Sequence, residues 1–200
     1  SIGVPLTDYA IVHAALALIE LATGECDFAL ASRVLRSPFI GGAQSEAMLR
    51  ARINVQLRRI ATPRLTLARL LAQLGDCAPA PLLHRHLEAL LDGARSSAAA
   101  QGEGRKSTRS AEDWAQHFAA LTKAAGFPGE RTLDSAEYLT HAKWTETLAQ
   151  FARLGRAVSR SWITTRLHVS GIASVRYTDP AAPAEVSPIA ANEYPVLGLV

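Results

Sequence analysis

The chain contains only two cysteines, Cys26 and Cys77, among its 200 residues. Two thiols cannot form the disulfide framework of a small secreted domain, so we expect a reducing, cytoplasmic environment. Long apolar runs are also missing. The longest, Ala10–Ala22, is interrupted by His13 and Glu20 and is shorter than the roughly 20 residues that cross a bilayer. No basic segment precedes it, as one would in a signal peptide, and we expect neither a membrane span nor a secretory leader.

Motifs of the common catalytic classes are absent too. The sequence has no G-x-x-x-x-G-K-[ST] phosphate loop, no G-x-S-x-G nucleophile elbow and no H-E-x-x-H zinc motif. Its acids are scattered, and Asp113, Asp134 and Glu137 stand where helix caps are expected. His84 and His86 are two residues apart, which places them on different faces of a helix. We therefore expect this segment to have no catalytic role, and to bind neither a metal nor another cofactor.

The pattern that is present is helical. Hydrophobic residues make up 48% of the chain and recur at helical spacing almost throughout, whereas the composition after Val169 becomes β-type and then rich in proline and alanine. We expect a mainly α fold, an irregular multi-helix domain of about seven or eight helices with an extended or β-like C-terminal tail. The predicted helices run from about Asp8 to Thr23, Asp27 to Leu35, Glu46 to Ile60, Thr66 to Leu74, Pro79 to Leu91, Ser110 to Ala125, Ser135 to Leu154 and Ser159 to His168.

The same pattern predicts how the chain is organised. Residues 1–95 form an N-terminal helical lobe that contains the arginine-rich helix. The segment Ser96–Thr108 lacks large apolar residues, so we expect a flexible linker over 96–109. Residues 110–168 continue the same domain, and 169–200 form an extended tail or the start of a neighbouring domain. Because the chain begins at Ser1 rather than methionine, we expect a fragment or a processed form of a longer protein.

The strongest functional signal is a block of arginines. Between Ala31 and Leu70 the chain has eight arginines and a single acid, Glu46, which gives this window a net charge of +7. The whole chain carries +3, so the remainder carries −4. A cationic block on an otherwise mildly acidic chain favours a polyanionic partner such as nucleic acid. The alternative is that long arginine side chains simply cover the solvent face of helices.

The arginines concentrate on the predicted helix from Glu46 to Ile60. Its expected apolar stripe consists of Leu49, Ile53, Leu57 and Ile60. A second face, with Arg50, Asn54 and Arg58, is then expected to meet solvent or phosphate. The candidate phosphate contacts are Arg50, Arg52, Arg58, Arg59 and Arg64, with Arg33 and Arg36 nearby.

Several segments, in their order along the chain, resemble one protein family. They are Gly3–Tyr9 (GVPLTDY), Val34–Gly42 (VLRSPFIGG), Ala51–Arg59 (ARINVQLRR) and Phe127–Tyr138 (FPGERTLDSAEY). They resemble the helicase-like subunits of bacterial recombinational repair, and more specifically the "probable DNA repair protein" family related to AddB and RecC. The resemblance covers roughly residues 3–155.

The resemblance implies a fold and a context. Proteins of this kind resemble superfamily I helicases, often with lost ATPase motifs, and many end in a PD-(D/E)xK nuclease domain. The phrase Leu35–Phe39 recurs at a corresponding place in their inserted helical subdomain, usually called 2B. Val169–Ala191 departs from the family pattern, whereas Tyr194–Val200 resembles the strand that opens the second motor-like lobe. The Walker motifs and nuclease carboxylates would lie outside this segment, so the resemblance assigns no catalytic residue to it.

Three functional hypotheses follow. The first is a non-catalytic helical subdomain of a DNA-repair helicase- or nuclease-like protein whose arginines contact the backbone of single-stranded, duplex or forked DNA in double-strand-break repair or recombination. The second is a protein–protein docking lobe whose arginines face an acidic partner subunit or the motor lobe of the same polypeptide. The third is a regulator with a helix-turn-helix, since Thr62-Pro63 breaks the chain between two predicted helices.

Overall fold

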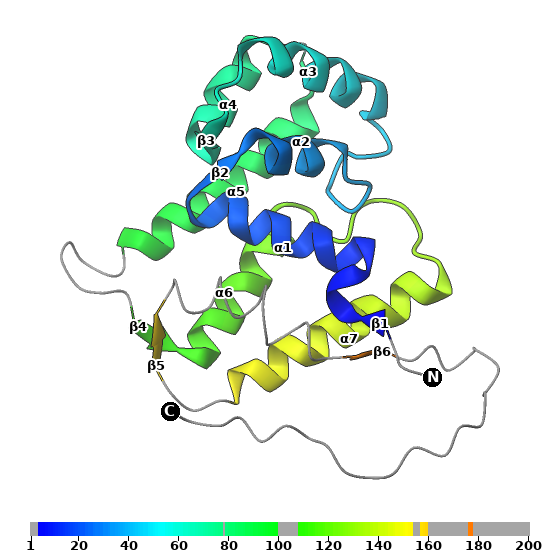
Figure 1. Ribbon diagram of the computed structural model, residues 1–200, viewed down its shortest axis with the longest axis vertical. Coiled ribbons are helices and arrows are strands. Elements are labelled where there is room, and N and C mark those ends of the chain that lie inside the picture. Colours follow the sequence, from blue (N-terminus) through cyan, green and yellow to red (C-terminus); the bar gives the residue numbers. More distant parts are fainter. Residues whose placement is uncertain (1–3, 78, 100–107, 154–156, 160–175, 178–200) are drawn as a thin grey trace.

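The computed structural model describes residues 4–77, 79–99, 108–153, 157–159 and 176–177, and it is mainly α, as the sequence predicts (Figure 1). The helices are α1 (Ala10–Thr23), α2 (Phe28–Arg36), α3 (Ala47–Ile60), α4 (Leu67–Gly75), α5 (Pro81–Ala99), α6 (Ala111–Ala124) and α7 (Ser135–Ala152), preceded by the short 3-10 helix η1 (Leu6–Asp8). The strands are β1 (Val4–Pro5), β2 (Glu25–Asp27), β3 (Arg64–Thr66), β4 (Thr108–Ser110), β5 (Ala157–Ser159) and β6 (Arg176–Tyr177). They form three antiparallel pairs, β1–β6, β2–β3 and β4–β5.

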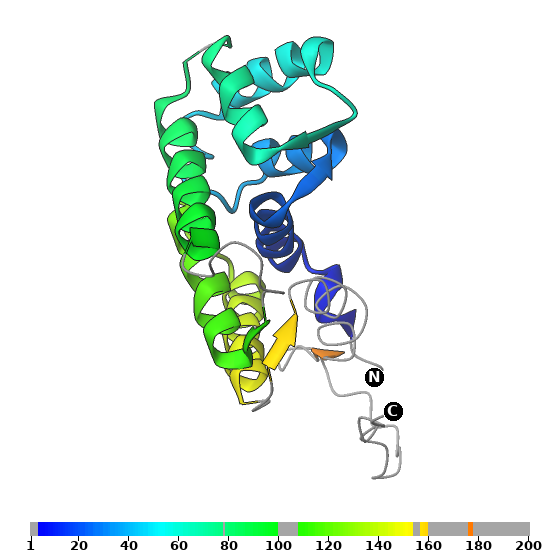
Figure 2. The same ribbon diagram turned by 90° about the vertical axis from the view of Figure 1, so that its left-hand side faces the viewer.

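Helix α1 lies at the centre of the fold. It contacts α2, α5, α6 and α7, and most of its side chains are buried, including Ile11, Leu18 and Leu21. Its composition explains this position, because a helix that is apolar nearly all round must be covered on several sides. Figure 1 shows α2, α3 and α4 on one side of α1, and α6 and α7 on the other. Helix α5 runs along one edge of the molecule between the two groups, as Figure 2 shows, and contacts both α4 and α6.

The helices on the α3 side of α1 include two strand–helix units, β2 with α2 and β3 with α4. Strands β2 and β3 pair with Cys26 opposite Leu65, and both of these side chains are buried. Each strand leads directly into a capped helix. The Asp27 carboxylate accepts a hydrogen bond from the Leu30 N–H at 2.6 Å at the start of α2, and the Thr66 hydroxyl caps α4 in the same way. The pairing therefore fixes the starting points of α2 and α4 against each other.

A tight junction of two loops joins the two groups of helices. One loop links α2 to α3 and the other links α6 to α7. The Gly41 N–H donates to the Ala125 carbonyl at 3.1 Å, and the Glu130 carboxylate accepts hydrogen bonds from the Gly42 N–H at 2.8 Å and from Ser45. Gly126 has φ +72°, and a Cβ there would lie 2.7 Å from the Gly41 Cα. The junction thus depends on backbones approaching more closely than side chains would permit.

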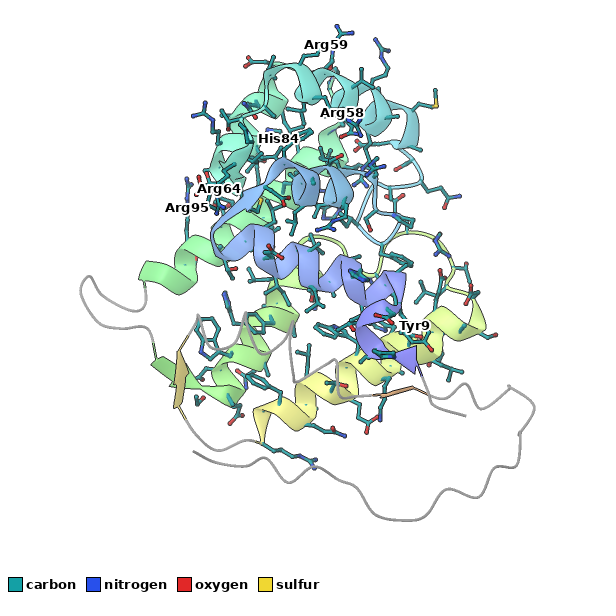
Figure 3. The ribbon with its side chains drawn as sticks, in the orientation of Figure 1. Tyr9, Arg58, Arg59, Arg64, His84 and Arg95 are labelled. Carbon is teal, nitrogen blue, oxygen red and sulfur yellow. The ribbon has the colours of Figure 1, made fainter. Side chains whose placement is uncertain are left out.

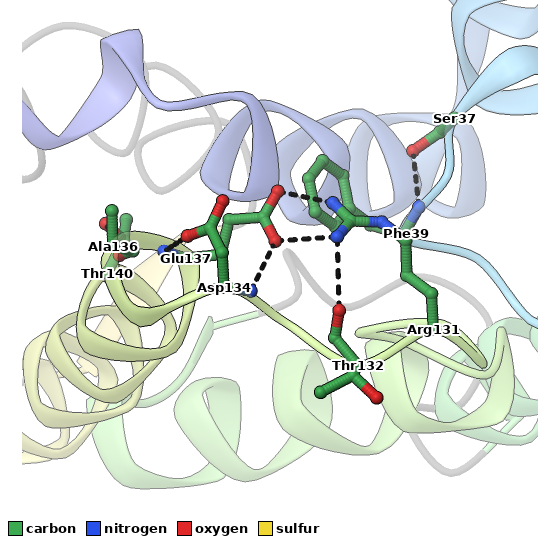
Figure 4. Close-up of polar contacts among 8 residues, drawn as sticks. All are labelled: Ser37, Phe39, Arg131, Thr132, Asp134, Ala136, Glu137 and Thr140. Carbon is green, nitrogen blue, oxygen red and sulfur yellow. Dashed lines mark hydrogen bonds and ion pairs between the residues drawn. The ribbon is translucent and has the colours of Figure 1, made fainter.

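The same junction is fastened at its other end by Arg131. Its guanidinium lies 5.0 Å from the centre of the Phe39 ring and donates to the Glu137 carboxylate, with an Nη1–Oε2 distance of 2.8 Å (Figure 4). Glu137 is also part of the capping box that starts α7, in which the Asp134 carboxylate accepts from the Glu137 N–H at 2.8 Å. The predicted caps at Asp134 and Glu137 are therefore confirmed. Arg131 ties this cap to the loop after α2.

Other elements differ from their predicted limits. Helix α5 continues to Ala99 rather than ending at Leu91; the added residues include three alanines and an arginine, which have high helix propensity. The predicted linker 96–109 thus overlaps α5 and β4, and its remaining residues, 100–107, lie outside the described part. Ser159 belongs to β5 rather than to a helix start, and 160–168 lies outside the described residues. Within the predicted tail, the structure describes Arg176–Tyr177 alone, as a strand.

The loop junction predicts a strong effect of Gly126→Ala. The substitution places a side chain at positive φ and drives a Cβ into the Gly41 backbone, so we expect it to lower the free energy of unfolding by about 2–4 kcal/mol. Urea unfolding followed by circular dichroism measures the change. Gly24→Ala is the matched control, because nothing lies within 4 Å of an added Cβ there. Equal stability of the two variants would contradict the close approach.

The Arg131–Glu137 contact predicts acid sensitivity. The hydrogen bond from Arg131 holds the pKa of Glu137 below its ordinary value, outweighing the opposing effect of burial. A carboxylate with a depressed folded pKa stabilises the fold above its unfolded pKa of about 4.3 and loses that contribution as the pH falls through the folded value. We expect Glu137→Gln to be less stable than the native chain at pH 7, with the difference shrinking below about pH 4. Glu146→Gln, an exposed acid on α7, should change little; pH-independent destabilisation by Glu137→Gln would contradict the linkage.

Candidate nucleic-acid interface

The predicted site residues lie on α2, α3 and β3. Arg33 and Arg36 are exposed on α2, Arg52, Arg58 and Arg59 are exposed on α3, and Arg64 is exposed on β3. Arg50 is the exception, since it is only 3% exposed. The structure therefore exposes six of the seven predicted arginines on α2, α3 and β3. Figure 3 labels three of them, Arg58, Arg59 and Arg64.

Helix α3 is rotated relative to the prediction. Its buried positions are Arg50, Ile53, Asn54 and Leu57, which follow the i, i+3, i+4, i+7 spacing of one helix face. The predicted apolar stripe is wrong at Ile60, which is 51% exposed. Ile60 is the last residue of α3 and lies beyond Leu57, the last residue of the helix that is buried. Likewise, Asn54 does not face solvent.

A buried polar contact explains this rotation. The Ser32 hydroxyl on α2 donates to the Asn54 side-chain oxygen at 2.7 Å, where α2 packs on α3. The contact satisfies two polar groups that would otherwise be costly to bury. It also draws the polar face of α3 inward, so that part of this face meets α2 rather than water.

Arg50 is a structural residue, and its prediction as a phosphate contact is wrong. Its guanidinium donates to the Gly41 carbonyl at 2.6 Å and to the Ser37 carbonyl at 3.4 Å, so two of its nitrogens are engaged with the loop after α2. Burial lowers the pKa of Arg50, while the nearby Glu46 and Glu130 carboxylates oppose that shift. The prediction failed because an arginine side chain can be buried when carbonyl oxygens accept its hydrogen bonds and nearby carboxylates offset its positive charge.

The lone acid of the cationic window also turns inward. Glu46 is only 5% exposed, and its carboxylate accepts hydrogen bonds from the Leu82 N–H at 2.7 Å and the Leu83 N–H at 2.8 Å. These are donors in the first turn of α5, which carries the positive end of the helix dipole. Glu46 therefore caps α5 from a distant part of the chain and does not neutralise the surface arginines.

Two exposed arginines, Arg36 on α2 and Arg58 on α3, each lie one helical turn from the Ser32–Asn54 contact. Arg36 lies one helical turn after Ser32, and its Nε donates to the Ser32 carbonyl at 3.2 Å. Arg58 lies one turn after Asn54, and Figure 3 shows it on the side of α3 toward α2. Arg33 is exposed on α2 beside Arg36. No carboxylate of the described residues forms an ion pair with Arg33, Arg36 or Arg58.

Arg64 stands apart from this group. Its Nε lies 3.1 Å from the Glu25 Oε2 across the β2–β3 pair, and both side chains are more than half exposed. Such a pair contributes little to stability, but the carboxylate offsets the local positive charge. Arg69, an exposed arginine on α4 that the sequence did not single out, has no such partner among the described residues. The positive surface therefore centres on α2 and α3 rather than on β3.

The connection between α3 and α4 bears on the helix-turn-helix hypothesis. The residues after Thr62-Pro63 form β3, which pairs with β2. A helix-turn-helix instead joins its two helices by a short turn. The Thr62-Pro63 break thus leads into a strand pairing in place of the expected turn.

A pocket of about 340 Å³ lies where α3 meets the end of α4 and the start of α5. Its floor is apolar, with Ile53, Leu74 and Leu83, and its rim includes His84 and Glu88, whose Nδ1 and Oε2 lie 3.3 Å apart. The nearby Cys77 has a raised pKa because of burial, with Asp76 adding to the effect. This pocket offers apolar contacts and a protonated thiol, and it does not extend the cationic surface.

Other chemistry is sparse in the described part of the chain. No group of three or more His, Cys, Asp or Glu side chains there is arranged to hold a metal ion. Burial, with Glu20 and Asp27 adding to it, raises the pKa of the Cys26 thiol to about 11, so Cys26 is protonated at neutral pH and packs as an apolar residue. None of the described helices combines the length and apolar character needed to cross a membrane.

No protein-family model, curated protein or solved structure matches this chain.

Residues that hold the interface in place were missed by the sequence reasoning. Glu46, Glu130 and Arg131 looked like ordinary surface charges, yet they fasten the loop after α2 to α5 and to the loop before α7. One signal was available for Glu46, because a single acid in a strongly cationic window is unusual. Glu130 carried no comparable signal, since the loop that it contacts lies almost 90 positions away along the chain. The contact of Arg131 with the Phe39 ring is equally distant in sequence, although its other partner, Glu137, is only six residues away.

Arg50 and Arg52 give a matched test of burial. Arg50→Ala leaves the Gly41 and Ser37 carbonyls without their donors and opens a cavity, so we expect it to lower the free energy of unfolding by about 2–4 kcal/mol. Arg52→Ala removes an exposed side chain of the same type and should change stability by no more than about 0.5 kcal/mol. Denaturant unfolding of both variants measures the difference. Similar values would mean that the Arg50 guanidinium is not needed to hold the loop.

Proposed function

We propose that this segment is a non-catalytic helical subdomain of a DNA-repair helicase- or nuclease-like protein, resembling the 2B subdomain, and that it contacts the DNA backbone during double-strand-break repair or recombination. The observation that carries the proposal is the set of exposed arginines on α2 and α3 that form no ion pair with any described residue, beside a lone acid, Glu46, that is turned inward.

The charge distribution supports backbone contact over base recognition. Arg33, Arg36 and Arg58 lie on neighbouring helices, where guanidinium groups can reach several phosphates at once. Contacts of this kind position a nucleic acid and carry no sequence information, which suits a repair protein that acts on any broken end.

The family resemblance supports the repair context. Two of the segments that carry it, Val34–Gly42 and Phe127–Tyr138, meet in the loop junction through Phe39 and Arg131. The junction sets the position of α3 relative to α6 and α7, so these segments have a structural role in presenting the arginines. The proposal assigns no catalytic step and no cofactor to this segment, and it places the protein in the cytoplasm.

Fluorescence anisotropy with labelled forked, duplex and single-stranded DNA across a salt series tests this proposal. We expect binding that weakens steeply with salt, and a loss of affinity in the Arg33→Ala/Arg36→Ala/Arg58→Ala variant. Each lost phosphate contact should reduce the slope of log affinity against log salt by about 0.7–0.9. The variant should therefore have a slope lower by about 2–3 than that of the native chain.

The matched control replaces three other exposed arginines, Arg85, Arg95 and Arg153, with alanine. It removes the same net charge from other parts of the described surface and should keep most of the affinity and slope. Failure of the native chain to bind any of the three DNA forms at about 50 mM salt, where phosphate contacts are strong, would overturn the proposal. An equal loss in both variants would mean that binding follows net charge alone.

A further inference from the structure

The outer face of α3 carries an exposed stripe that alternates apolar and basic side chains. Met48 is 78% exposed and Val55 is 54% exposed, while Arg52 and Arg59 are exposed between and after them. These four residues, called here the α3 stripe, follow the spacing i, i+4, i+7, i+11, which places them on one side of the helix.

The stripe lies away from the rest of the fold. The other side of α3 packs on α2 and α4 through Ile53, Asn54 and Leu57. Figure 3 shows Arg59 beyond the outer edge of α3. Met48 and Val55 occupy successive heptad positions on this side of α3, and their exposure leaves apolar area in contact with water.

We propose that the α3 stripe docks an acidic amphipathic helix of a protein partner. Met48 and Val55 are seven residues apart, about 10.5 Å along the helix axis, which matches the spacing of apolar residues on a heptad-patterned helix. Apolar side chains of the partner pack on Met48 and Val55, and its flanking carboxylates pair with Arg52 and Arg59. Helix α3 contains no acid that would repel them.

Charge and chemistry select this occupant over two others. A second copy of this chain docking through the same stripe would oppose Arg52 and Arg59 with identical arginines, which is unfavourable. A nucleic acid would satisfy the arginines but would leave Met48 and Val55 against a charged backbone. Arg58 is about 100° from Arg59 around the helix, so the side of α3 toward α2 stays available for phosphate contacts. This inference does not depend on DNA binding.

The test uses a labelled synthetic peptide with leucine at the heptad core positions and glutamate at the flanking positions. We expect it to bind the native chain, and expect Met48→Ser/Val55→Ser to weaken binding at least about tenfold, a free-energy change of 1.4 kcal/mol. Tyr138→Ser is the matched control, because Tyr138 is 64% exposed on α7 and should leave binding unchanged. Circular dichroism confirms that these surface variants are folded.

A charge swap completes the test. Arg52→Glu/Arg59→Glu should lose the glutamate peptide and gain binding to the same peptide with lysine at the flanking positions. The proposal is overturned if the native chain binds neither peptide, or binds both equally well. It is also overturned if Met48→Ser/Val55→Ser reduces DNA affinity without affecting peptide affinity, since the stripe would then be a nucleic-acid surface.

Discussion

The buried guanidinium of Arg50 is the constraint on which the interface depends. By donating to the Gly41 and Ser37 carbonyls, it holds the loop after α2 against the first half of α3. The same loop accepts the close approach of Gly126 and presents its N–H groups to Glu130. Burial of Arg50, together with the Ser32–Asn54 hydrogen bond, thus fixes the rotation of α3, and the rotation decides which of the remaining arginines face solvent.

Two acidic residues near α3 are held by hydrogen bonds to backbone groups. Glu46 and Glu130 both lie near the arginine-rich helix, yet each carboxylate is committed to backbone N–H groups. Hydrogen bonds from Ser45, Gly42 and the Gln44 N–H lower the pKa of Glu130 despite the opposing effect of burial, so it stays ionised in that role. Both carboxylates are therefore engaged by donors of the junction and of α5, whereas Arg33, Arg36 and Arg58 have no carboxylate partner among the described residues.

Sequence patterns predicted the local features of this fold well. The helix starts at Asp27 and Ser110 and the cap at Asp134 are as expected, because each depends on a few neighbouring residues. The rotation of α3 was not predictable in this way, because its apolar residues fit two neighbouring stripes and the choice is made by Ser32 and the Gly41 loop. The β2–β3 pair joins segments far apart in sequence, so their short strands had no local signal.

The rotation of α3 also separates arginines that the sequence analysis had grouped together. Arg58 and Arg59 are adjacent in the sequence and form one basic pair there, but consecutive residues point in directions about 100° apart around a helix. Arg58 lies toward α2, beside a polar contact, whereas Arg59 shares its face with Met48 and Val55. A polyanion and a protein helix need different binding surfaces, because positive charge is enough to bind a polyanion, whereas a protein helix also needs apolar area to pack against. The two proposals therefore assign DNA and a protein partner to different faces of the same short helix.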